Sequence, residues 1–505
     1  MEQKISVYNS LSREKEAFEP ISGQFVGMYV CGPTVYGEPH LGHARSAITF
    51  DLVFRYLKYC GYKVRYVRNI TDVGHLENDA DEGDDKIAKR ARIEQLEPME
   101  VAQEYTLAYH LAMDKLNVMR PSIEPRATGH IIEQIEMIQK IINEGLAYVS
   151  NGSVYFDVLK YNEKEPYGEL SGRVLDDLMA HAGEERRTLE GSDEKKNHFD
   201  FALWKRASPE HIMRWNSPWS EGFPGWHIEC SAMSSKYLGE QFDIHGGGMD
   251  LLFPHHECEI AQSKASNHTH PAKYWMHNNM ITINGQKMGQ SLGNAINLNQ
   301  FFAGDHPLLH RAYSALTIRF FMLQAHYRST LDFSNEALDA AEKGLKKLIN
   351  GLRTAEILLA ENIEDLGTAV DEELNKELST EIDAVFEGIN NDFNSAKSIA
   401  ELYNLLKRIN SIKAGHLKTE NIRRDIFEKL LNTYISFNHE VLGISEAKML
   451  ESMNILPLVD RLMENYREAR AEKNFVMVDK IRAQFKEAGL VVMDGKGGSE
   501  WAYAE

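Results

Sequence analysis

Two histidines three residues apart, His40 and His43, flank Gly42 at the end of a turn rich in glycine and proline. Residues 25–30 before the turn are typical of a buried strand, and residues 44–59 after it carry apolar side chains near helical spacing. A helix N-terminus offers unpaired N–H groups and partial positive charge, which favour phosphate. The pattern predicts a nucleotide-binding unit, although a bare His-x-Gly-His is more often a pair of surface histidines.

A second strand is predicted over residues 62–70, and it ends at Thr71. This strand completes a βαβ unit with the strand and helix before it. Residues at the carboxyl ends of parallel strands face the ligand crevice. Thr71 is therefore expected near whatever ligand His40 and His43 bind.

A lysine loop far downstream supplies a cation for the same chemistry. The motif Lys287-Met288-Gly289-Gln290-Ser291 follows a β-like run over residues 280–283 and an Asn284-Gly285 turn. Lys287 is therefore expected on a short, glycine-containing loop.

These two motifs resemble the signature sequences of class I aminoacyl-tRNA synthetases. Three further segments narrow the match: Tyr29 to Tyr36, Gly225 to Ser231, and Phe253 to Glu257. On these residues the chain resembles the cysteinyl-tRNA synthetase family over essentially its full length. The resemblance implies a ligase that activates L-cysteine with ATP to cysteinyl-adenylate and transfers it to the 3′ end of tRNA(Cys).

The resemblance also implies roles for individual residues. His40, His43 and Lys287 would be catalytic and would donate hydrogen bonds to the phosphates of Mg²⁺-bound ATP. The ATP site would also include Gly32, Thr34, Gly42 and Gln290, and the cysteine pocket would be lined by Gly32, Thr71, Trp226 and His245. Gln290 stands where the family usually has a second lysine, so the loop keeps hydrogen-bond donors but loses a positive charge.

Cysteine, histidine and glutamate positions suggest a metal site. Pro254 is a good first residue for a helix, so His255 and Glu259, four residues apart, should share one helical face. Cys31 and Cys230 lie far apart in the chain, and a lone cysteine is more often a buried apolar residue. The resemblance implies that these four residues bind one zinc ion, which takes the thiolate of substrate cysteine. Thiolate ligands favour zinc over Mg²⁺ or Ca²⁺.

Two alternatives to this ligand set stay open. Cys258 lies beside Glu259, where the family usually has asparagine, and on nearly the same helical face as His255. A set of three cysteines and one histidine is therefore chemically possible. His256 would be rotated by about 100° from His255 around a helix, which makes it a weaker candidate.

The charge balance limits the way in which a nucleic acid can bind. The chain has 56 Lys and Arg against 75 Asp and Glu, a net charge of −19. This balance excludes nonspecific binding of nucleic acid over the whole surface, so a tRNA must contact local basic faces.

No apolar run reaches roughly 18 residues and the N-terminus has no signal-peptide pattern, which predicts a cytoplasmic protein without membrane contact. The four cysteines form no CxxC pair, so reduced thiols are expected. We also expect the protein to be a monomer.

The predicted fold is α/β: a Rossmann-like catalytic domain with an inserted connective domain, then an α-helical bundle and a small mixed C-terminal domain. The predicted segments are 1–120 (first catalytic half), 121–218 (connective insertion), 219–285 (second half with the zinc site), 286–330 (signature loop and stem contact), 331–450 (helical tRNA- and anticodon-binding domain) and 451–505 (C-terminal anticodon-recognition subdomain). The tRNA roles follow from the resemblance alone.

Several local patterns add structural expectations. Residues 86–116 predict a long helix interrupted near Pro98, and residues 77–85, with six acids in nine positions, predict a solvated loop. A strand over residues 242–244 should end at His245 and three glycines, which suggest close approach of the backbone to a ligand. Basic residues between 407 and 424 fit an ordinary solvated helix face, unless the family's tRNA role applies to them.

Three other functions were weighed against the ligase. An adenylating enzyme with a small acceptor, such as an amino sugar, would not need the long helical tail after residue 330. A catalytically weak zinc- or RNA-binding paralogue would not need His40, His43 and Lys287. A nucleotidyltransferase without zinc would leave Cys31, Cys230 and His255 unexplained.

Overall fold

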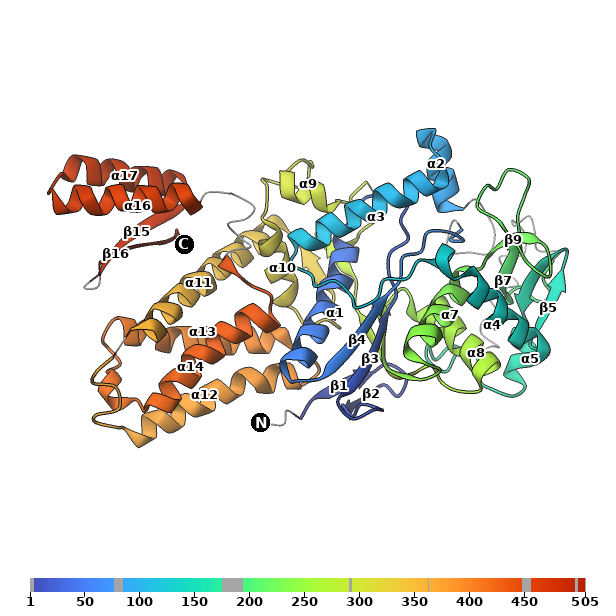
Figure 1. The fold of residues 1–505 in the computed structure, drawn as a ribbon, viewed down its shortest axis with the longest axis horizontal. Coiled ribbons are helices and arrows are strands. Elements are labelled where there is room, and N and C mark those ends of the chain that lie inside the picture. Colours follow the sequence, from blue (N-terminus) through green and yellow to red (C-terminus); the bar gives the residue numbers. More distant parts are fainter. Residues whose placement is uncertain are drawn as a thin grey trace. The chain divides into compact units, whose positions relative to one another are not determined.

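The computed structural model describes residues 4–76, 85–174, 194–289, 293–361, 363–446, 456–495 and 498–504. The chain forms two compact units (Figure 1). The first comprises Met1–Asp114, Met119–Ile281 and Tyr327–Thr330, and the second comprises Lys115–Val118, Thr282–His326 and Leu331–Glu505. The finer division into six segments stays a prediction.

A four-stranded parallel sheet forms the centre of the first unit, in the order β11-β10-β3-β4. The strands are β3 (Phe25–Val30), β4 (Lys63–Arg68), β10 (Phe242–Gly248) and β11 (Ala272–Asn278). Helix α1 (Leu41–Tyr59) connects β3 to β4, and α8 (Glu257–Asn267) connects β10 to β11, as parallel strands require. The predicted strand, turn and helix are confirmed, and α1 begins at Leu41 because His40 caps it.

An N-terminal hairpin covers one edge of this sheet. Strands β1 (Ser6–Asn9) and β2 (Glu14–Ala17) pair antiparallel. The side chain of Asn9 donates to the carbonyl of Lys273 and accepts from the N–H of Trp275, both on β11. The edge strand therefore finds partners within the chain instead of exposing unpaired backbone groups.

Helices cover the sheet and lead into the insertion. Helices α2 (Lys86–Glu94) and α3 (Pro98–Lys115) are separated at Pro98, as predicted. The 3-10 turn η2 (Ala127–His130) precedes α4 (Ile131–Asn143), and α7 (Trp226–Leu238) leads from the insertion to β10. Residues 77–84 of the predicted acidic loop lie outside the described residues.

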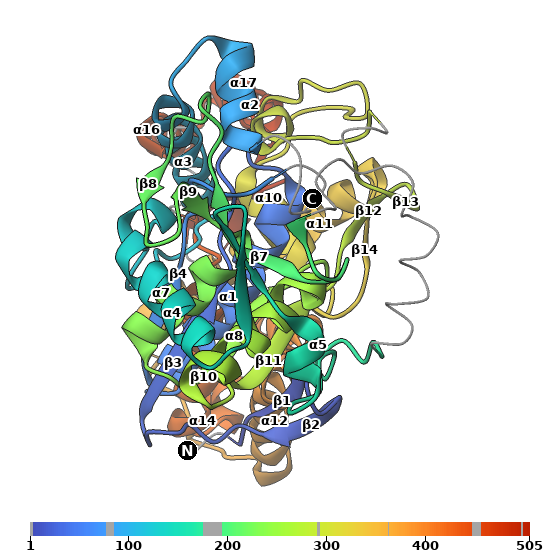
Figure 2. The ribbon, with the colours of Figure 1, turned by 90° about the vertical axis from the view of Figure 1, so that its right-hand side faces the viewer.

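The insertion forms its own antiparallel sheet in the order β5-β6-β7-β9-β8, and Figure 2 shows β7, β8 and β9 beside α4 and α7. Its elements are β5 (Ala147–Ser150), β6 (Ser153–Phe156), α5 (Val158–Asn162), β7 (Phe201–Arg206), β8 (Trp215–Asn216) and β9 (Glu221–Pro224). Phe156 and Phe201 stack with ring centroids 4.8 Å apart, and Trp204 is fully buried. These aromatic side chains give the insertion a core of its own.

The second unit begins with a three-stranded sheet and continues as a helical bundle (Figure 1). Its first elements are β12 (Ile281–Ile283), β13 (Gln286–Lys287), α9 (Leu298–Ala303), α10 (Ala315–Leu323) and β14 (Leu331–Phe333). The bundle comprises α11 (Asn335–Ala360), α12 (Glu372–Asn390), α13 (Ser395–Lys413), η6 (Thr419–Asn421), α14 (Arg424–Ser436) and the π-helical turn η7 (Phe437–Val441). The side chains of Ser334, Asp371 and Asn394 cap the long helices, and the predicted α-helical bundle is confirmed.

The C-terminal segment is a helical pair followed by a hairpin, which agrees with the small mixed domain that the sequence predicted. Its elements are α16 (Leu456–Ala471), α17 (Phe475–Glu487), β15 (Leu490–Gly495) and β16 (Gly498–Tyr503). The guanidinium of Arg353, on α11, lies 3.1 Å from the ring centroid of Trp501. This cation–π contact attaches the hairpin to α11.

A buried arginine joins separate parts of the second unit. Arg319, on α10, is fully buried, and its guanidinium donates to the carbonyl oxygens of Leu442 (2.7 Å), Leu116 (3.2 Å) and Asn117 (3.2 Å). These carbonyls belong to segments far apart in the sequence. Buried acceptors that lose their donor are costly, so the arginine stabilises the packing of these two segments, residues 116–117 and Leu442, against α10.

We expect Arg319→Met to lower the free energy of unfolding of the second unit by about 3 kcal/mol, because three buried carbonyls lose their donor. Urea unfolding followed by helical circular dichroism measures the change. The control is Arg461→Met, since the side chain of Arg461 is 74% exposed and its loss should cost less than about 0.5 kcal/mol. Equal transitions for the two variants would contradict the role of Arg319.

Candidate active site and metal centre

Reciprocal hydrogen bonds of His40 and His43 cap the N-terminus of helix α1. Nδ1 of His40 accepts from the N–H of Gly42 (3.1 Å), and Nδ1 of His43 accepts from the N–H of His40 (3.2 Å). The two imidazoles stack with centroids 3.9 Å apart. Because each Nδ1 accepts, the proton of each neutral ring is on Nε2. The turn therefore carries two neighbouring N–H donors at a helix N-terminus.

Both imidazoles are neutral at physiological pH. Burial lowers the pKa of His40 to about 4. Burial, together with the neighbouring His40, lowers the pKa of His43 well below its usual range. The pair therefore offers a phosphate directional hydrogen bonds rather than positive charge, and the charge must come from other groups.

Asn69 fixes the backbone on which the predicted ligand-binding residues lie. Its Oδ1 accepts from the N–H of Gly32 (2.8 Å), and its Nδ2 donates to Oγ1 of Thr71 (3.1 Å). A Cβ at position 32 would lie 1.6 Å from the carbonyl oxygen of Asn69, so only glycine fits there. Thr71 in turn donates to Oε2 of the buried Glu229 (3.0 Å). The sequence patterns assigned no role to Asn69, which belongs to none of the motifs, or to Glu229, which lies within the family segment Gly225 to Ser231.

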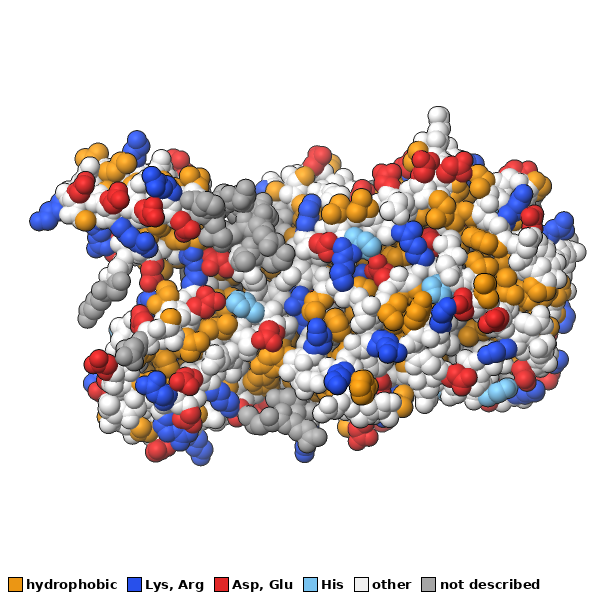
Figure 3. All heavy atoms as spheres, in the orientation of Figure 1, with side chains coloured by type: hydrophobic (Ala, Val, Ile, Leu, Met, Phe, Trp, Pro, Cys, Tyr) orange, Lys and Arg blue, Asp and Glu red, His pale blue; other side chains and the backbone are white. Residues whose placement is uncertain are grey.

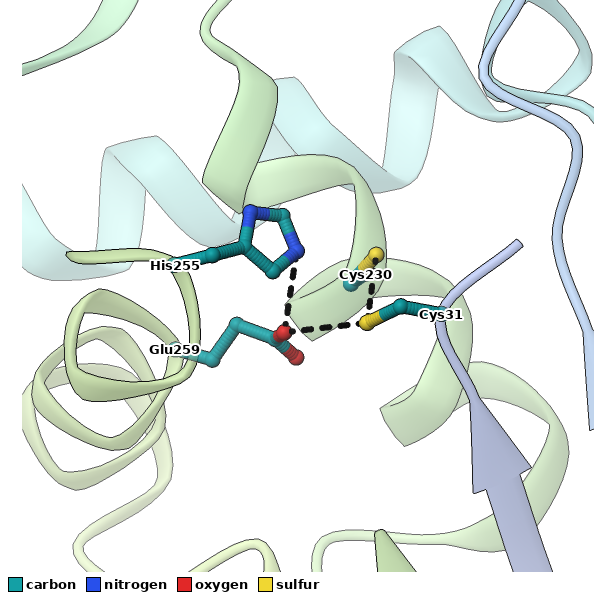
Figure 4. Close-up of side chains that lie close together, drawn as sticks. All are labelled: Cys31, Cys230, His255 and Glu259. Atoms are coloured by element: carbon teal, nitrogen blue, oxygen red, sulfur yellow. Dashed lines mark hydrogen bonds and ion pairs between the residues drawn. The ribbon is translucent and has the colours of Figure 1, made fainter. Parts of the chain in front are cut away.

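Four potential metal ligands converge from separate segments (Figure 4). Cys31 follows β3, Cys230 lies on α7, His255 lies in the turn η4 (Leu252–His256), and Glu259 lies on α8. Their ligand atoms all lie within 4.8 Å of one another. The shared face predicted for His255 and Glu259 is confirmed, with Nε2 and Oε1 3.2 Å apart.

The spacing of these ligands fits a small tetrahedral ion. Two sulfurs on a tetrahedral zinc, with bonds of ~2.3 Å, lie ~3.8 Å apart. The Sγ atoms of Cys31 and Cys230 are 3.7 Å apart, and Cys31 Sγ is 3.6 Å from Oε1 of Glu259. Both the distances and the mixture of sulfur, nitrogen and oxygen donors therefore suit a metal of this kind.

His256 also approaches this centre, although the sequence made it a weaker candidate than His255. Its Nε2 lies 3.3 Å from Sγ of Cys31, and it forms a second possible donor group with Cys31, His245 and Glu259. The π-helical η4 precedes α8, and Phe253, which comes before Pro254, is extended. The rotation of about 100° per residue of a regular α-helix therefore does not apply here.

His256 also forms a hydrogen bond with His277 (2.8 Å), and Nδ1 of His277 lies 2.8 Å from the hydroxyl of Ser10.

The predicted cysteine-binding residue His245 is engaged by the metal centre. It is fully buried, its Nε2 lies 2.8 Å from Oε2 of Glu259, and its ring stacks on Trp275 at 4.4 Å. In this arrangement His245 orients the carboxylate of Glu259.

The three glycines after His245 continue strand β10 instead of forming a turn. The predicted close approach to the backbone is present, but the groups that approach are side chains of the protein itself. A Cβ on Gly246 would lie 2.2 Å from the ring of Phe50, and one on Gly247 would lie 2.8 Å from the imidazole of His256. The glycines therefore make room for α1 and for a histidine of the metal centre.

Cys258 lies outside both donor groups found among the described residues. Its Sγ lies 3.4 Å from the hydroxyl of Tyr167, and its side chain belongs to the apolar core shared with Phe156 and Trp204. The alternative in which Cys258 replaces Glu259 receives no support from this geometry. Cys258 has the environment of an ordinary buried thiol.

The charges of the centre are set by burial and by neighbouring groups. Burial alone would raise the pKa of Glu259, but His245 and His255 lower it to about 2. Burial likewise opposes ionisation of Cys230, but hydrogen bonds from Cys31 and the charge of His255 lower its pKa to about 6. Burial opposes the charge on His255, yet Cys230 and Glu259 raise its pKa to about 10. Burial and Cys230 raise the pKa of Cys31 well above its usual range.

The lysine loop belongs to the second unit. The predicted Asn284-Gly285 turn is confirmed, since both residues have positive φ, and Lys287 is exposed at the end of β13. Asn294 closes the loop: its Nδ2 donates to the carbonyl of Lys287 (3.0 Å) and its Oδ1 accepts from the N–H of Gly289 (2.8 Å). Gln290 and Ser291 lie outside the described residues.

The basic residues that the sequence singled out near the bundle are ion-paired. Arg408 pairs with Glu381 (2.7 Å), Lys413 with Glu500 (3.4 Å) and Arg423 with Asp425 (3.1 Å). On the face shown in Figure 3, basic and acidic side chains are interspersed over both units. For these residues the structure favours the solvated helix face over a continuous RNA-binding surface.

Comparison with known proteins identifies the family. Residues 17–343 match the tRNA synthetases class I (C) catalytic domain, and residues 384–446 match the DALR domain. The cysteine–tRNA ligase of Cytophaga hutchinsonii is 58% identical, and the alignment covers 100% of this chain and 99% of that protein. The chain belongs to the cysteine–tRNA ligase family. The ligases of Bacteroides thetaiotaomicron (56% identical) and Chlorobaculum tepidum (46%) each align over 99% of both chains.

Solved structures support the class I fold of this family member. A Mycobacterium tuberculosis methionyl-tRNA synthetase in complex with methionyl-adenylate has a TM-score of 0.54 at 13% identity, over 90% of this chain and 96% of that chain. The Agrobacterium radiobacter K84 LeuRS–tRNA–LeuAMS complex has a TM-score of 0.58 at 12% identity, over 86% of each chain. The predicted class I catalytic fold is confirmed. Among the described helices, none combines the length and the apolarity needed to cross a bilayer.

The charges of the centre predict the protons that metal binding must release. At pH 7 Cys31 is a thiol and His255 is an imidazolium, while Cys230 and Glu259 are largely ionised. Ligation needs both thiolates and a neutral imidazole, so each bound ion should displace about two protons. The number should rise towards three below pH 6, where Cys230 is protonated.

Calorimetric titration of the metal-free chain with Zn²⁺, in buffers of different ionisation enthalpy, measures this release. Release of fewer than about one proton per ion at pH 7 would contradict the assigned charges. Release that does not change across pH 6 would contradict the ionised state of Cys230.

Proposed function

We propose that this chain is the ligase that charges tRNA(Cys) with cysteine. In the first step a carboxylate oxygen of L-cysteine attacks the α-phosphorus of ATP, and pyrophosphate leaves with its electron pair. In the second step a hydroxyl of the terminal tRNA ribose attacks the carbonyl of cysteinyl-adenylate, and AMP leaves. The observation that carries the proposal is the convergence of two thiols, an imidazole and a carboxylate at the end of β3, in a chain of this family.

The nucleotide is bound by the histidine turn and the lysine loop. His40 and His43 donate from Nε2 to phosphate oxygens, and Lys287 adds the positive charge that neutral imidazoles lack. The remaining ATP contacts are assigned to Gly32, Thr34, Gly42 and Gln290, and Mg²⁺ enters with the nucleotide as part of the substrate. In-line displacement at phosphorus depends on positioning and charge stabilisation, so no protein nucleophile is needed.

The amino acid is selected at the metal centre. Cys31, Cys230, His255 and Glu259 would hold one zinc ion, and the 3.7 Å spacing of the two sulfurs supports this. When bound, zinc stabilises the thiolate of substrate cysteine and stabilises the hydroxyl of serine poorly. His245 holds Glu259 in place through its 2.8 Å contact, and Thr71 and Trp226 line the pocket.

The tRNA is assigned to the insertion and to the helical second unit. The match of residues 384–446 to the DALR domain supports tRNA contact by the bundle. Residues 451–505 would read the anticodon, and residues 121–218 and 286–330 would lie near the acceptor end and the stem. Because the basic residues of the bundle are paired, recognition would use local contacts rather than a continuous positive field. The protein would act as a cytoplasmic monomer.

We expect zinc-loaded protein to catalyse ATP–pyrophosphate exchange with cysteine. The kcat/KM for serine should be lower by about 10⁴, because the hydroxyl of serine leaves the metal without the thiolate partner that cysteine supplies. Removal of the metal with a chelator should abolish exchange, and added Zn²⁺ should restore it. The matched variants are Cys230→Ser, which should lose both metal and exchange, and Cys258→Ser, which should keep its metal. Exchange with no amino acid would refute the ligase, and exchange with serine equal to that with cysteine would refute selection by the metal.

The sequence departure at Gln290 gives a separate prediction. Gln290→Lys would restore a positive charge to the loop, and one charge-assisted contact to a phosphate is worth about 1.5–3 kcal/mol. We expect the adenylation rate in single-turnover assays to rise about tenfold. Gln290→Met, which removes the hydrogen-bond donors, should slow the reaction. An unchanged rate for the lysine variant would mean that adenylation in this chain does not use a cation at that position.

A further inference from the structure

His75 lies flat against the indole of Trp226. The two rings are 4.0 Å apart between centroids and only 12° from parallel, and His75 is 7% exposed. On the adjoining side Trp226 approaches the metal-centre residue His255, with ring centroids 4.4 Å apart. The indole therefore contacts two histidines, His255 of the metal centre and His75, to which the mechanism above gives no role.

Both nitrogens of His75 have polar partners. Nε2 lies 2.8 Å from Nζ of Lys86, and Nδ1 lies 2.5 Å from Oγ1 of Thr34. An ammonium group can only donate, so Nε2 accepts and Nδ1 carries the proton that is donated to Thr34. These two bonds fix the plane of the ring as well as its tautomer.

The backbone around His75 is built for this position. Gly74 has a φ of +78°, and a Cβ there would lie 2.5 Å from the carbonyl oxygen of Pro224, two residues before Trp226. The N–H of Gly74 donates to Asp85 (2.9 Å), and the carbonyl of His75 accepts from the N–H of Lys86 (3.0 Å). The glycine lets the segment before α2 pack directly against the start of α7, which brings the two rings face to face.

We propose that His75 is a positioning residue for cysteine selection: it holds the indole of Trp226 against the pocket and ties it, through Thr34, to the nucleotide-binding turn. The inference rests on the proposed function, because it takes Trp226 as a wall of the cysteine pocket. An indole that is fixed by its stack on His75 has fewer orientations to lose when the amino acid binds, so the stack favours binding of cysteine. Binding of ATP gains little, since Trp226 is assigned to the cysteine pocket and not to the ATP contacts.

The test compares KM for cysteine and for ATP in pyrophosphate exchange by zinc-loaded variants. His75→Ala removes the stack, and we expect KM for cysteine to rise about tenfold, while KM for ATP and kcat change by less than about threefold. His75→Phe keeps a flat ring, and we expect KM for cysteine to return to within about threefold of the parent. A residue needed only for folding would lower kcat through loss of active protein and would leave KM unchanged.

His130→Ala is the matched control. His130 has the same 7% exposure and also bonds through both nitrogens, to the carbonyl of Arg126 (2.7 Å) and the hydroxyl of Tyr237 (2.8 Å). It has no stack with Trp226, so KM for cysteine should stay within about twofold of the parent. Zinc content of every variant, measured by atomic absorption, should equal that of the parent.

An unchanged KM for cysteine in His75→Ala would overturn the inference, as would a phenylalanine variant as impaired as the alanine variant. A KM for ATP that rises as much as KM for cysteine would overturn the assignment of the stack to the amino-acid side. Each of these outcomes leaves cysteine-dependent exchange by the parent chain intact. Failure of the proposed function would instead abolish exchange in the parent itself.

Discussion

The buried carboxylate of Glu259 imposes the main constraint on the first unit. It is 1% exposed and pairs with two imidazoles, Nε2 of His245 at 2.8 Å and Nε2 of His255 at 3.2 Å. Removing a charge from water costs several kcal/mol, which is recovered only when its partners are held accurately. The strand that carries His245, the turn that carries His255 and the helix that carries Glu259 must therefore meet within a few ångströms, and the glycines of β10 allow this approach.

The turn after β3 joins two sites with opposite electrostatic character. Its first residue, Cys31, belongs to a cluster of charged and ionisable groups, whereas its last residues, His40 and His43, are kept neutral by burial. Neutral imidazoles can direct hydrogen bonds to phosphate without attracting the carboxylate of Glu259. Asn69 keeps the first part of this turn against the end of β4, so that thiol chemistry and phosphate binding share one rigid support.

The second unit is stabilised differently. Its core depends on amphipathic helices with side-chain caps and on the buried guanidinium of Arg319, and several of its surface charges form ion pairs with one another. Exposed ion pairs of this kind contribute little stability, typically under about 1 kcal/mol each. They do keep a chain with a net charge of −19 from presenting a general positive surface, which leaves recognition of RNA to individual contacts.

The sequence by itself determined the elements and the chemistry that act locally. Apolar patterns predicted β3 and α1, and Pro98 predicted the break between α2 and α3, because these features depend on neighbours within a few residues. The four-residue spacing placed His255 and Glu259 on one face, and the family resemblance supplied Cys31 and Cys230. Only the tertiary structure brought the two thiols to 3.7 Å, directed His256 to the centre and Cys258 into the core, and laid His75 on Trp226. These contacts join residues from separate strands and helices, and a π-helical turn altered the local rotation, so no spacing rule within one segment could determine them.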